Sequence, residues 1–289
     1  MSEDGIGRRV SSSPRTTYKM MGGDPGAPPD GTAFQIKVLA SGSAGNAILA
    51  RARDTCLLVD AGLSADALAR ALAPLSLTLS DLTAILLTHE HDDHARGAAG
   101  ISRQAGIPIF STETVARACR EMFADAMVET FRPEVPFRIG PFTIEAFPLP
   151  HDAIDPVGFH LSLDGARAVV ALDFGDLEEP FLERAKGAQL LILEANYDLH
   201  LLREGPYPWF VKNRILSRRG HLSNDAAARA AVASATGNLQ TVLLVHLSEV
   251  NNLAPLARDT VKWALEREGL GHVRVEVVRP NGQSPLLVI

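Results

Sequence analysis

This chain has few cysteines, no long apolar run and no excess of basic residues. Two cysteines among 289 residues are too few for a disulfide framework or a cysteine-based zinc site. No segment approaches the roughly 18–20 consecutive apolar residues that a membrane span requires. These absences argue against a membrane protein and against a small disulfide-stabilised secreted domain. We expect a protein of the reducing cytoplasm that has no membrane partner.

The formal net charge of −6 at pH 7 bears on nucleic-acid binding. A protein that coats nucleic acid is usually basic, whereas this chain has a sequence pI of about 5.8. An enzyme that touches a polymer over a few phosphates needs to be basic only locally. The composition therefore weakens the case for a nucleic-acid substrate without excluding it.

The first 33 residues differ in composition from the rest of the chain. They are rich in Ser, Gly, Pro and Arg and contain no apolar segment of the kind found in secretory signals. We expect residues 1–33 to be a disordered tail. Residues 34–289 contain no clear linker and no fixed-period repeat, so they are expected to form one domain.

From residue 34 onward, short apolar runs alternate with helical stretches. Strands grouped between helices predict an α/β protein: an αβ/βα sandwich of two mixed β-sheets with helices on the outer faces. The predicted strands span residues 34–40, 47–50, 55–59, 83–88, 107–110, 142–147, 157–163, 167–172, 189–193, 241–245 and 273–278. The predicted helices span residues 65–72, 95–105, 112–122, 224–235 and 255–268.

The sequence His-Glu-His-Asp-Asp-His at residues 89–94 carries the most information about function. It directly follows the apolar run at 83–88, so it lies at the mouth of a buried strand, where ligands of layered α/β proteins bind. The histidine spacing is not the i, i+4 spacing of a helical metal pair. A tight turn would instead aim side chains at two neighbouring points, which suits two metal ions about 3.5–4 Å apart. The alternative, a solvated histidine-rich turn, should arise by chance on the order of once in thousands of such chains.

Three more residues repeat the arrangement of an apolar strand, then a ligand-type side chain, then a turn. They are His151 after Leu149-Pro150, Asp173 after residues 167–172, and His246 after residues 241–245. A lone histidine at a strand end is more often structural than a ligand. The recurrence of one pattern favours convergence of these side chains at one edge of the sheets.

Together these residues resemble the ordered ligand motifs of metallo-β-lactamase-fold hydrolases. The resemblance implies two divalent metal ions, most simply zinc, with manganese or iron as substitutes. It assigns His89, His91 and His151 to one metal, Asp93, His94 and His246 to the other, and Asp173 to both. Asp60 would lie behind the site and orient a ligand. On its sequence alone, Asp60 is equally well explained as a turn residue before Gly62.

Four further segments resemble the YycJ/WalJ-type branch of that superfamily, which is related to ribonuclease J and the β-CASP nucleases. This resemblance implies a DNA exonuclease or a related phosphodiesterase. The chain departs from ribonuclease J in lacking room for a separate β-CASP domain, which makes long-RNA processing a poorer fit. The segments are Leu39–Asn46, Glu194–Tyr197, Gly220–Asn224 and His246–Asn252.

Two residues are the catalytic candidates, Asp93 and His221. In the implied chemistry, a metal-bridging hydroxide is the nucleophile, because two cations lower the pKa of a shared water toward neutrality. His221 is suited to contact phosphate or to act as a general acid, since imidazole titrates near neutral pH. It also lies just upstream of a helix that Ser223 or Asn224 could cap, so a structural role stays open.

Aromatic and basic residues alternate between residues 207 and 219, next to His221. One interpretation is a groove that follows a nucleic-acid strand. The other is an amphipathic helix with Trp209 and Phe210 in the core and solvated basic residues outside. In the small-residue loop at 41–46, backbone N–H groups could bind a phosphate, or the loop could serve packing alone. The substrate-binding candidates are Ser43, Asn46, Lys212, Arg214, Arg218 and Arg219.

Two functions therefore compete. The first is a dinuclear-metal phosphodiesterase that acts on nucleic acid as its partner, with a DNA exonuclease as the leading form. The second is a small-molecule hydrolase of the same fold that cleaves a thioester, lactone or cyclic phosphodiester. The basic and aromatic stretch favours the first, and the acidic pI favours the second. A non-catalytic protein is disfavoured because every ligand position holds a competent residue.

Overall fold

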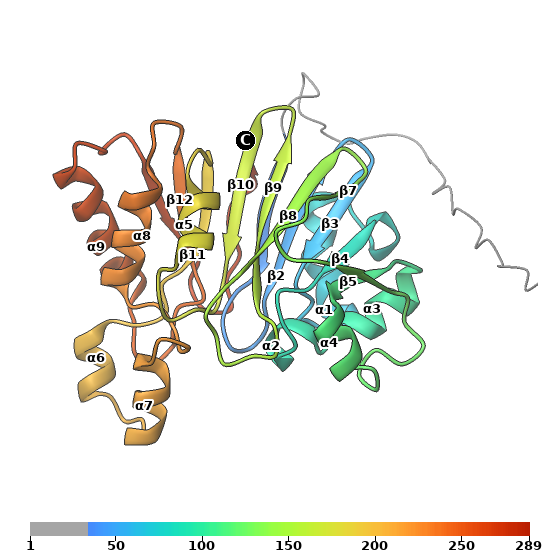
Figure 1. Ribbon diagram of the computed structural model, residues 1–289, viewed down its shortest axis with the longest axis horizontal. Coiled ribbons are helices and arrows are strands. Elements are labelled where there is room, and N and C mark those ends of the chain that lie inside the picture. The colour runs from blue at the N-terminus through green and yellow to red at the C-terminus, as the bar shows by residue number, and fades with distance from the viewer. Residues whose placement is uncertain (1–33) are drawn as a thin grey trace, which may run out of the picture.

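The computed structural model describes residues 34–289; the predicted tail at 1–33 lies outside the described residues. Two seven-stranded sheets pack face to face, and helices cover both outer faces (Figure 1). This arrangement confirms the predicted sandwich. Within residues 34–289, no helix combines the length and apolar character that crossing a membrane requires.

The first sheet has the strand order β14-β1-β2-β3-β4-β5-β6. Neighbouring strands are antiparallel from β14 to β3 and parallel from β3 to β6. Its strands are β1 (Gln35–Ala40), β2 (Ala47–Ala52), β3 (Thr55–Val59), β4 (Ala84–Leu86), β5 (Ile109–Thr112), β6 (Val128–Phe131) and β14 (Leu287–Val288).

The second sheet, ordered β13-β12-β11-β10-β9-β8-β7, repeats this plan. Its strands are antiparallel from β7 to β10 and parallel from β10 to β13. In each sheet the carboxyl ends of the parallel strands therefore lie at one edge, which positions the site. The strands are β7 (Phe137–Ile139), β8 (Phe142–Pro148), β9 (Val157–Leu163), β10 (Ala166–Ala171), β11 (Leu190–Glu194), β12 (Thr241–Val245) and β13 (Arg274–Val277).

The helices divide between the two outer faces. Helices α1, α3 and α4 cover the first sheet, whereas α5, α8 and α9 cover the second (Figure 1). The α-helices are α1 (Ala65–Leu72), α2 (Asp92–Ala95), α3 (Ala98–Ala105), α4 (Glu113–Ala118), α5 (Glu179–Ala185), α6 (Leu199–Glu204), α7 (Trp209–Leu216), α8 (Asn224–Ser234) and α9 (Ala254–Arg267). Two 3₁₀ helices span Ala73–Leu75 and Leu79–Asp81.

The expected helix starts follow from side-chain caps. Ser64 accepts a hydrogen bond from the backbone of Ala67, and Ser223 accepts one from Ala226, which satisfies N–H groups that a first helical turn leaves unpaired. The predicted helix at 95–105 is only partly right, because helix α3 begins after Gly97. The N–H of Gly97 donates to the carbonyl of Ala61, and a Cβ at this position would meet the Leu63 carbonyl oxygen at 1.8 Å.

The central core lies between the two sheets and consists of aliphatic and phenylalanine side chains. Phe34 and Phe142 meet edge to face with ring centroids 5.2 Å apart, and Phe131 meets Phe159 in the same way at 5.7 Å. Two further apolar clusters lie under the outer helices. This packing fixes the positions of the strand ends that form the site.

Candidate metal centre

Strand ends from both sheets meet at one edge, and three of them carry an unusual backbone. Asp60 follows β3, Asp173 follows β10 and His246 follows β12, with φ angles of 61°, 50° and 55°. Non-glycine residues rarely adopt a positive φ, and such strain is concentrated at functional sites because the surrounding structure must hold it. All three side chains are buried. The folded core therefore holds three polar side chains in place at the cost of local backbone strain.

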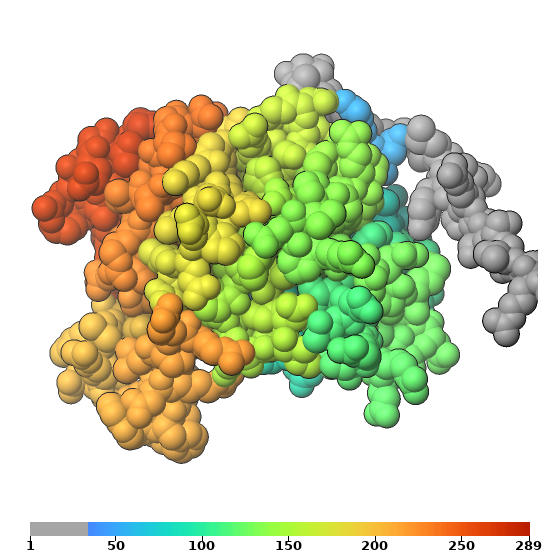
Figure 2. All heavy atoms as spheres, in the orientation of Figure 1, coloured from blue at the N-terminus to red at the C-terminus, as the bar shows by residue number. Residues whose placement is uncertain are grey.

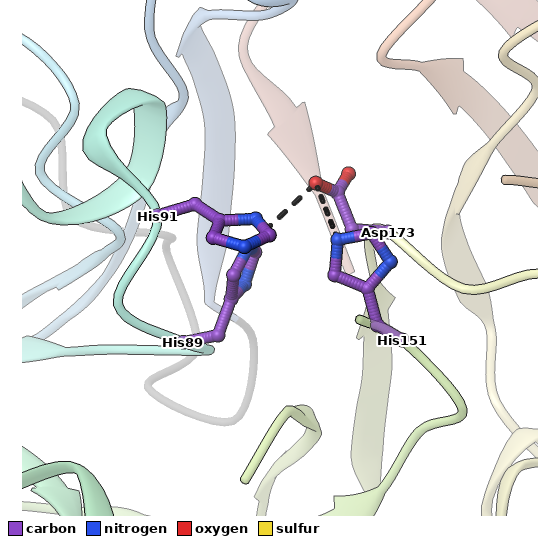
Figure 3. A group of neighbouring side chains, drawn as sticks. All are labelled: His89, His91, His151 and Asp173. Atoms are coloured by element: carbon purple, nitrogen blue, oxygen red, sulfur yellow. Dashed lines mark ion pairs between the residues drawn. The ribbon is translucent and has the colours of Figure 1, made fainter. Parts of the chain in front are cut away.

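His89, His91, His151 and Asp173 form the first ligand group. One potential ligand atom from each lies within 4.8 Å of the others. Figure 3 shows the four side chains pointing toward one another, with Asp173 Oδ2 between His89 Nε2 at 3.6 Å and His151 Nε2 at 3.7 Å. The structure thus brings together the residues that the resemblance assigned to one metal.

Asp93, His94, Asp173 and His246 form the second ligand group, again with ligand atoms within 4.8 Å of one another. Helix α2 supplies Asp93 and His94, while Asp173 and His246 come from the opposite sheet. Asp173 belongs to both groups. Its position between them agrees with the bridging role that the sequence implied for it.

The buried nitrogen atoms of this centre fit divalent cations. Nε2 of His89, His151 and His246 is buried and makes no hydrogen bond within residues 34–289. Buried polar atoms nearly always have partners, so three orphaned imidazole nitrogens in one cluster of His and Asp side chains indicate ligand positions. Burial lowers the pKa of His89 and of His151, which favours the neutral form that a metal ligand needs. For His94 and His246, neighbouring carboxylates outweigh burial and raise the pKa. Nitrogen and carboxylate donors of this kind suit zinc.

The Nδ1 atoms of these imidazoles are held by neighbouring groups. His151 Nδ1 donates to the Gly220 carbonyl oxygen at 3.0 Å, and His94 Nδ1 lies 2.6 Å from Asp60 Oδ2. Thr88 Oγ1 donates to Asp60 at 2.9 Å, which leaves it to accept from His89 Nδ1 at 2.9 Å. A proton fixed on Nδ1 leaves the lone pair of Nε2 facing the centre.

The sequence interpretation missed the role of Glu194, which is fully buried at the end of β11. Its Oε2 accepts hydrogen bonds from the backbone N–H groups of Phe174 and Leu222, at 3.2 and 3.1 Å. Its Oε1 lies 2.5 Å from His221 Nδ1 and 3.1 Å from His246 Nδ1. Glu194 follows an apolar strand in the same way as Asp173 and His246, so the same pattern could have revealed it.

His221 lies beside the ligand groups. Its ring centroid is 5.3 Å from that of His151 and 5.6 Å from that of His246. Burial by itself lowers the pKa of His221, but the Glu194 carboxylate outweighs burial and raises that pKa above its ordinary value. The Glu194 contact therefore favours the protonated form of His221 and occupies its Nδ1.

The loop at residues 41–46 makes hydrogen bonds to three of the proposed ligand residues. Asn46 is buried, and its backbone N–H donates to the Asp93 carbonyl at 2.7 Å, while its Nδ2 lies 3.0 Å from His94 Nε2. Ser41, which the sequence did not single out, accepts from the His246 N–H at 2.8 Å. Ser43 is exposed at the tip of the loop. Of the two loop candidates, only Ser43 is presented to solvent.

The aromatic residues of the basic stretch lie on helix α7, which buries no side chain. Trp209 is 70% exposed and Phe210 is 75% exposed. Burial of these two side chains in the core, one of the two interpretations of this stretch, is therefore wrong. The helix forms, but its aromatic residues face solvent.

The four basic candidates at 212–219 all make polar contacts, three of them with the segments that follow Pro150 and Asp173. Arg214 pairs with Asp152 next to His151, and Arg218 pairs with Asp176 at 2.7 Å. Lys212 donates to the Arg203 carbonyl at 2.6 Å and Arg219 donates to the His151 carbonyl at 2.9 Å. A cavity of about 410 Å³ lies beside His151 and is lined by Leu149, Pro150, His151, Glu178, Arg218 and Arg219.

Comparison with known proteins places the chain in a family. A family model described as "Beta-lactamase superfamily domain" matches residues 55–247. The chain belongs to this superfamily. It is 34% identical over 249 residues to the exodeoxyribonuclease YycJ of Bacillus anthracis, with 82% of this chain and 91% of that protein covered. It is 33% identical over 265 residues to the exodeoxyribonuclease WalJ of Streptococcus pneumoniae, with 89% and 98% covered.

Solved structures of this superfamily share the fold. The metallo-β-lactamase-fold protein YhfI of Bacillus subtilis matches with a TM-score of 0.67 at 20% identity, covering 88% of this chain and 99% of that one. The short form of human tRNase Z matches with a TM-score of 0.60 at 17% identity, covering 87% and 98%. The expected metallo-β-lactamase-fold hydrolase and its resemblance to the YycJ/WalJ branch are both confirmed.

Proposed function

We propose that this superfamily member is a dinuclear-metal phosphodiesterase, and that it acts as a DNA exonuclease in the cytoplasm. The observation that carries the proposal is the pair of ligand groups that share Asp173, with the His221 imidazole beside them. The names of the YycJ and WalJ relatives support DNA as the substrate.

In this proposal His89, His91 and His151 would hold one cation, Asp93, His94 and His246 would hold the other, and Asp173 would be shared by both sites. Zinc is the metal we propose, with manganese or iron as substitutes. When bound, two such cations lower the pKa of water toward neutrality and neutralise charge on the phosphoryl oxygens. Asp60 orients His94 through the hydrogen bond to Nδ1.

His221 and Asp93 have the properties that proton transfer requires. Because Glu194 binds Nδ1 of His221 and favours the protonated ring, the N–H at Nε2 can donate a proton to the leaving alkoxide. Burial opposes ionisation of Asp93, but its contacts with His246 and His94 outweigh burial and hold its pKa well below the usual range. Asp93 therefore stays a carboxylate and can accept a hydrogen bond from the attacking water.

The substrate contacts differ in how much charge they offer to a phosphate. Lys212 and Arg219 have neutral carbonyl partners, so their positive charges are not compensated by those contacts. Arg214 and Arg218 are each paired with a carboxylate. We propose that Lys212 and Arg219 make the main electrostatic contribution and that Ser43 offers a hydroxyl. Asn46 acts by bracing the turn at Asp93.

A small-molecule hydrolase is the second candidate, and the cavity beside His151 is the observation that favours it. Its volume of about 410 Å³ lies in the range of small-ligand sites, roughly 300–1,000 Å³. Two arginines and Glu178 give it polar walls, which suits a charged thioester or a cyclic phosphodiester. A lactone without charge fits this lining less well.

The deciding experiment is hydrolysis of 5′-labelled single- and double-stranded DNA by protein loaded with zinc or manganese. We expect stepwise shortening that requires metal and is absent in His91→Ala. Turnover of a thioester or of bis-p-nitrophenyl phosphate without any cleavage of DNA would replace the exonuclease with the small-molecule hydrolase.

A further inference from the structure

Helices α6 and α7 form a projecting arm, residues 199–216. Figure 1 shows both helices beyond the edge of the second sheet, and in Figure 2 the same segment stands out as a separate lobe. Helix α6 buries Leu202, whereas helix α7 buries no side chain. Helix α7 is therefore not held in place by a hydrophobic core of its own.

The arm presents two adjacent aromatic side chains to solvent. Trp209 and Phe210 are 70% and 75% exposed, more than any other large apolar side chain in residues 34–289. Phe34, Phe142 and Phe147, by contrast, are completely buried. Single exposed apolar residues are common, but two neighbouring aromatic rings on a projecting helix indicate a contact surface.

Polar contacts tie the arm to the loop that carries His151. Arg214 of α7 pairs with Asp152, and Arg219 just beyond the helix donates to the His151 carbonyl. The Gly220 carbonyl accepts from His151 Nδ1. Arg214 lies five residues after Trp209, a distance of roughly 8 Å along a helix axis. The helix that carries the aromatic pair is thus joined, at its C-terminal end, to the loop that borders the metal centre.

The charge around the pair identifies the class of partner. Residues 209–219 contain Lys212, Arg214, Arg218 and Arg219 and no acidic residue, although the whole chain has a net charge of −6. Arg214 and Arg218 are paired with carboxylates, so the positive charge offered to a partner comes mainly from Lys212 and Arg219. Uncompensated positive charge on an acidic protein fits a polyanion. Exposed aromatic faces beside positive charge are the combination on which unpaired bases stack.

We propose that Trp209 and Phe210 form a stacking platform for unpaired bases near a single-stranded DNA end whose phosphodiester lies at the metal centre. The proposal rests on the proposed exonuclease function and adds a contact between the protein and the bases near the cleaved end. Bases in a duplex are already stacked on their neighbours, so the platform engages only single-stranded or frayed ends.

The test compares a double variant, Trp209→Ala with Phe210→Ala, with the wild-type protein on three substrates. These are a single-stranded oligonucleotide, the same strand with abasic residues near the cleaved end, and bis-p-nitrophenyl phosphate. Trp263→Ala is the matched control, because Trp263 is 59% exposed but lies on α9 and stacks with Arg267. Light scattering on each protein reports its oligomeric state.

We expect the ratio of kcat/KM on the oligonucleotide to kcat/KM on the small ester to fall at least about tenfold in the double variant, mainly through KM. For the wild-type protein, abasic residues should lower this ratio by about the same factor. For the double variant they should lower it less than about threefold, because the aromatic ring and the base act as one pair. Trp263→Ala should match the wild type on every substrate.

Three results would overturn the platform. Wild-type cleavage of DNA with an unchanged ratio in the double variant refutes the platform and leaves the exonuclease standing. Conversion of a wild-type dimer into a monomer by the double substitution shows that the aromatic pair is a contact between two copies of the chain. Absence of any DNA cleavage by the metal-loaded wild type removes the exonuclease, and the platform with it.

Discussion

Replacing Glu194 with Gln tests how protons are placed around the metal centre. The carboxylate is fully buried and accepts four contacts: two from backbone N–H groups at Oε2 and two from the Nδ1 atoms of His221 and His246 at Oε1. Glutamine has the same shape but only one oxygen. The backbone N–H groups of Phe174 and Leu222 cannot accept a hydrogen bond, so the new NH₂ group must face the two imidazoles.

This orientation reverses the hydrogen bonds to both rings. An NH₂ group facing Nδ1 favours the tautomer in which Nδ1 is the acceptor and Nε2 carries the proton. For His246 this change is opposed by Asp173, whose Oδ1 lies 2.8 Å from the same Nδ1. Metal affinity should therefore fall by about tenfold, the lower end of the ~10–100-fold effect of losing a supporting contact. His221 loses the carboxylate that raises its pKa, and loss of a general acid lowers kcat on the order of 10²–10⁴-fold. The activation barrier rises by about 3–5 kcal/mol.

Two assays separate the two effects. Metal titration followed by direct metal analysis measures the contribution of His246, and kcat at saturating metal measures that of His221. Circular dichroism and urea unfolding establish that the variant is folded. Glu145→Gln is the control, because Glu145 pairs with Arg184 at 2.8 Å on a different part of the sheet. A folded Glu194→Gln protein with wild-type metal affinity and a kcat within threefold of wild type would refute the reasoning.

Three further predictions concern close packing, charge and pH. Gly62→Ala should lower the free energy of unfolding by about 1–3 kcal/mol and weaken metal binding, because its Cβ would meet the Asp93 carbonyl oxygen at 1.8 Å; Gly100→Ala, which meets nothing within 4 Å, should not destabilise the protein in urea. Lys212→Gln should reduce the slope of log affinity against log salt for single-stranded DNA by about 0.7, whereas Arg218→Gln, whose charge is already paired, should change it less; equal slopes would contradict this division. Burial lowers the pKa of His160 from the ordinary value of 6.5, so below that pH the unfolded state takes up a proton more readily and stability falls. His160→Gln should therefore lose less stability than wild type in urea unfolding between pH 7.5 and 5.5, and an equal loss would contradict the assignment.

Local pattern predicted much of the secondary structure. The strands at 55–59, 157–163 and 241–245 and the helix at 65–72 have the expected bounds, because each combines an apolar period with a turn or a cap at its end. Strands β6, β7 and β14 and helices α5 and α6 were not predicted. They are short elements of two to seven residues, too short for a period to stand out, and they form because neighbouring elements provide partners.

The sequence was also sufficient to predict which side chains are candidate metal ligands. It was not sufficient to predict the hydrogen bonds that hold those side chains. Seven His and Asp side chains could be chosen because each follows an apolar strand or lies in the motif at 89–94, and the structure groups all seven around Asp173. Glu194 and Ser41 escaped notice because their contacts join segments that are far apart in the chain: Glu194 contacts His246, and Ser41 contacts the His246 backbone.

The sequence by itself determined the ligand chemistry, because residue type and strand-end position are local properties. It also determined that residues 209–219 are basic and aromatic. Only the tertiary structure decided where those aromatic side chains lie, because burial depends on what packs over a helix, and nothing in the described chain covers Trp209 and Phe210. In the same way, folding of two distant sheets onto one core brings Asp173 between two histidine groups and leaves three buried imidazole nitrogens of this cluster without hydrogen-bond partners within residues 34–289.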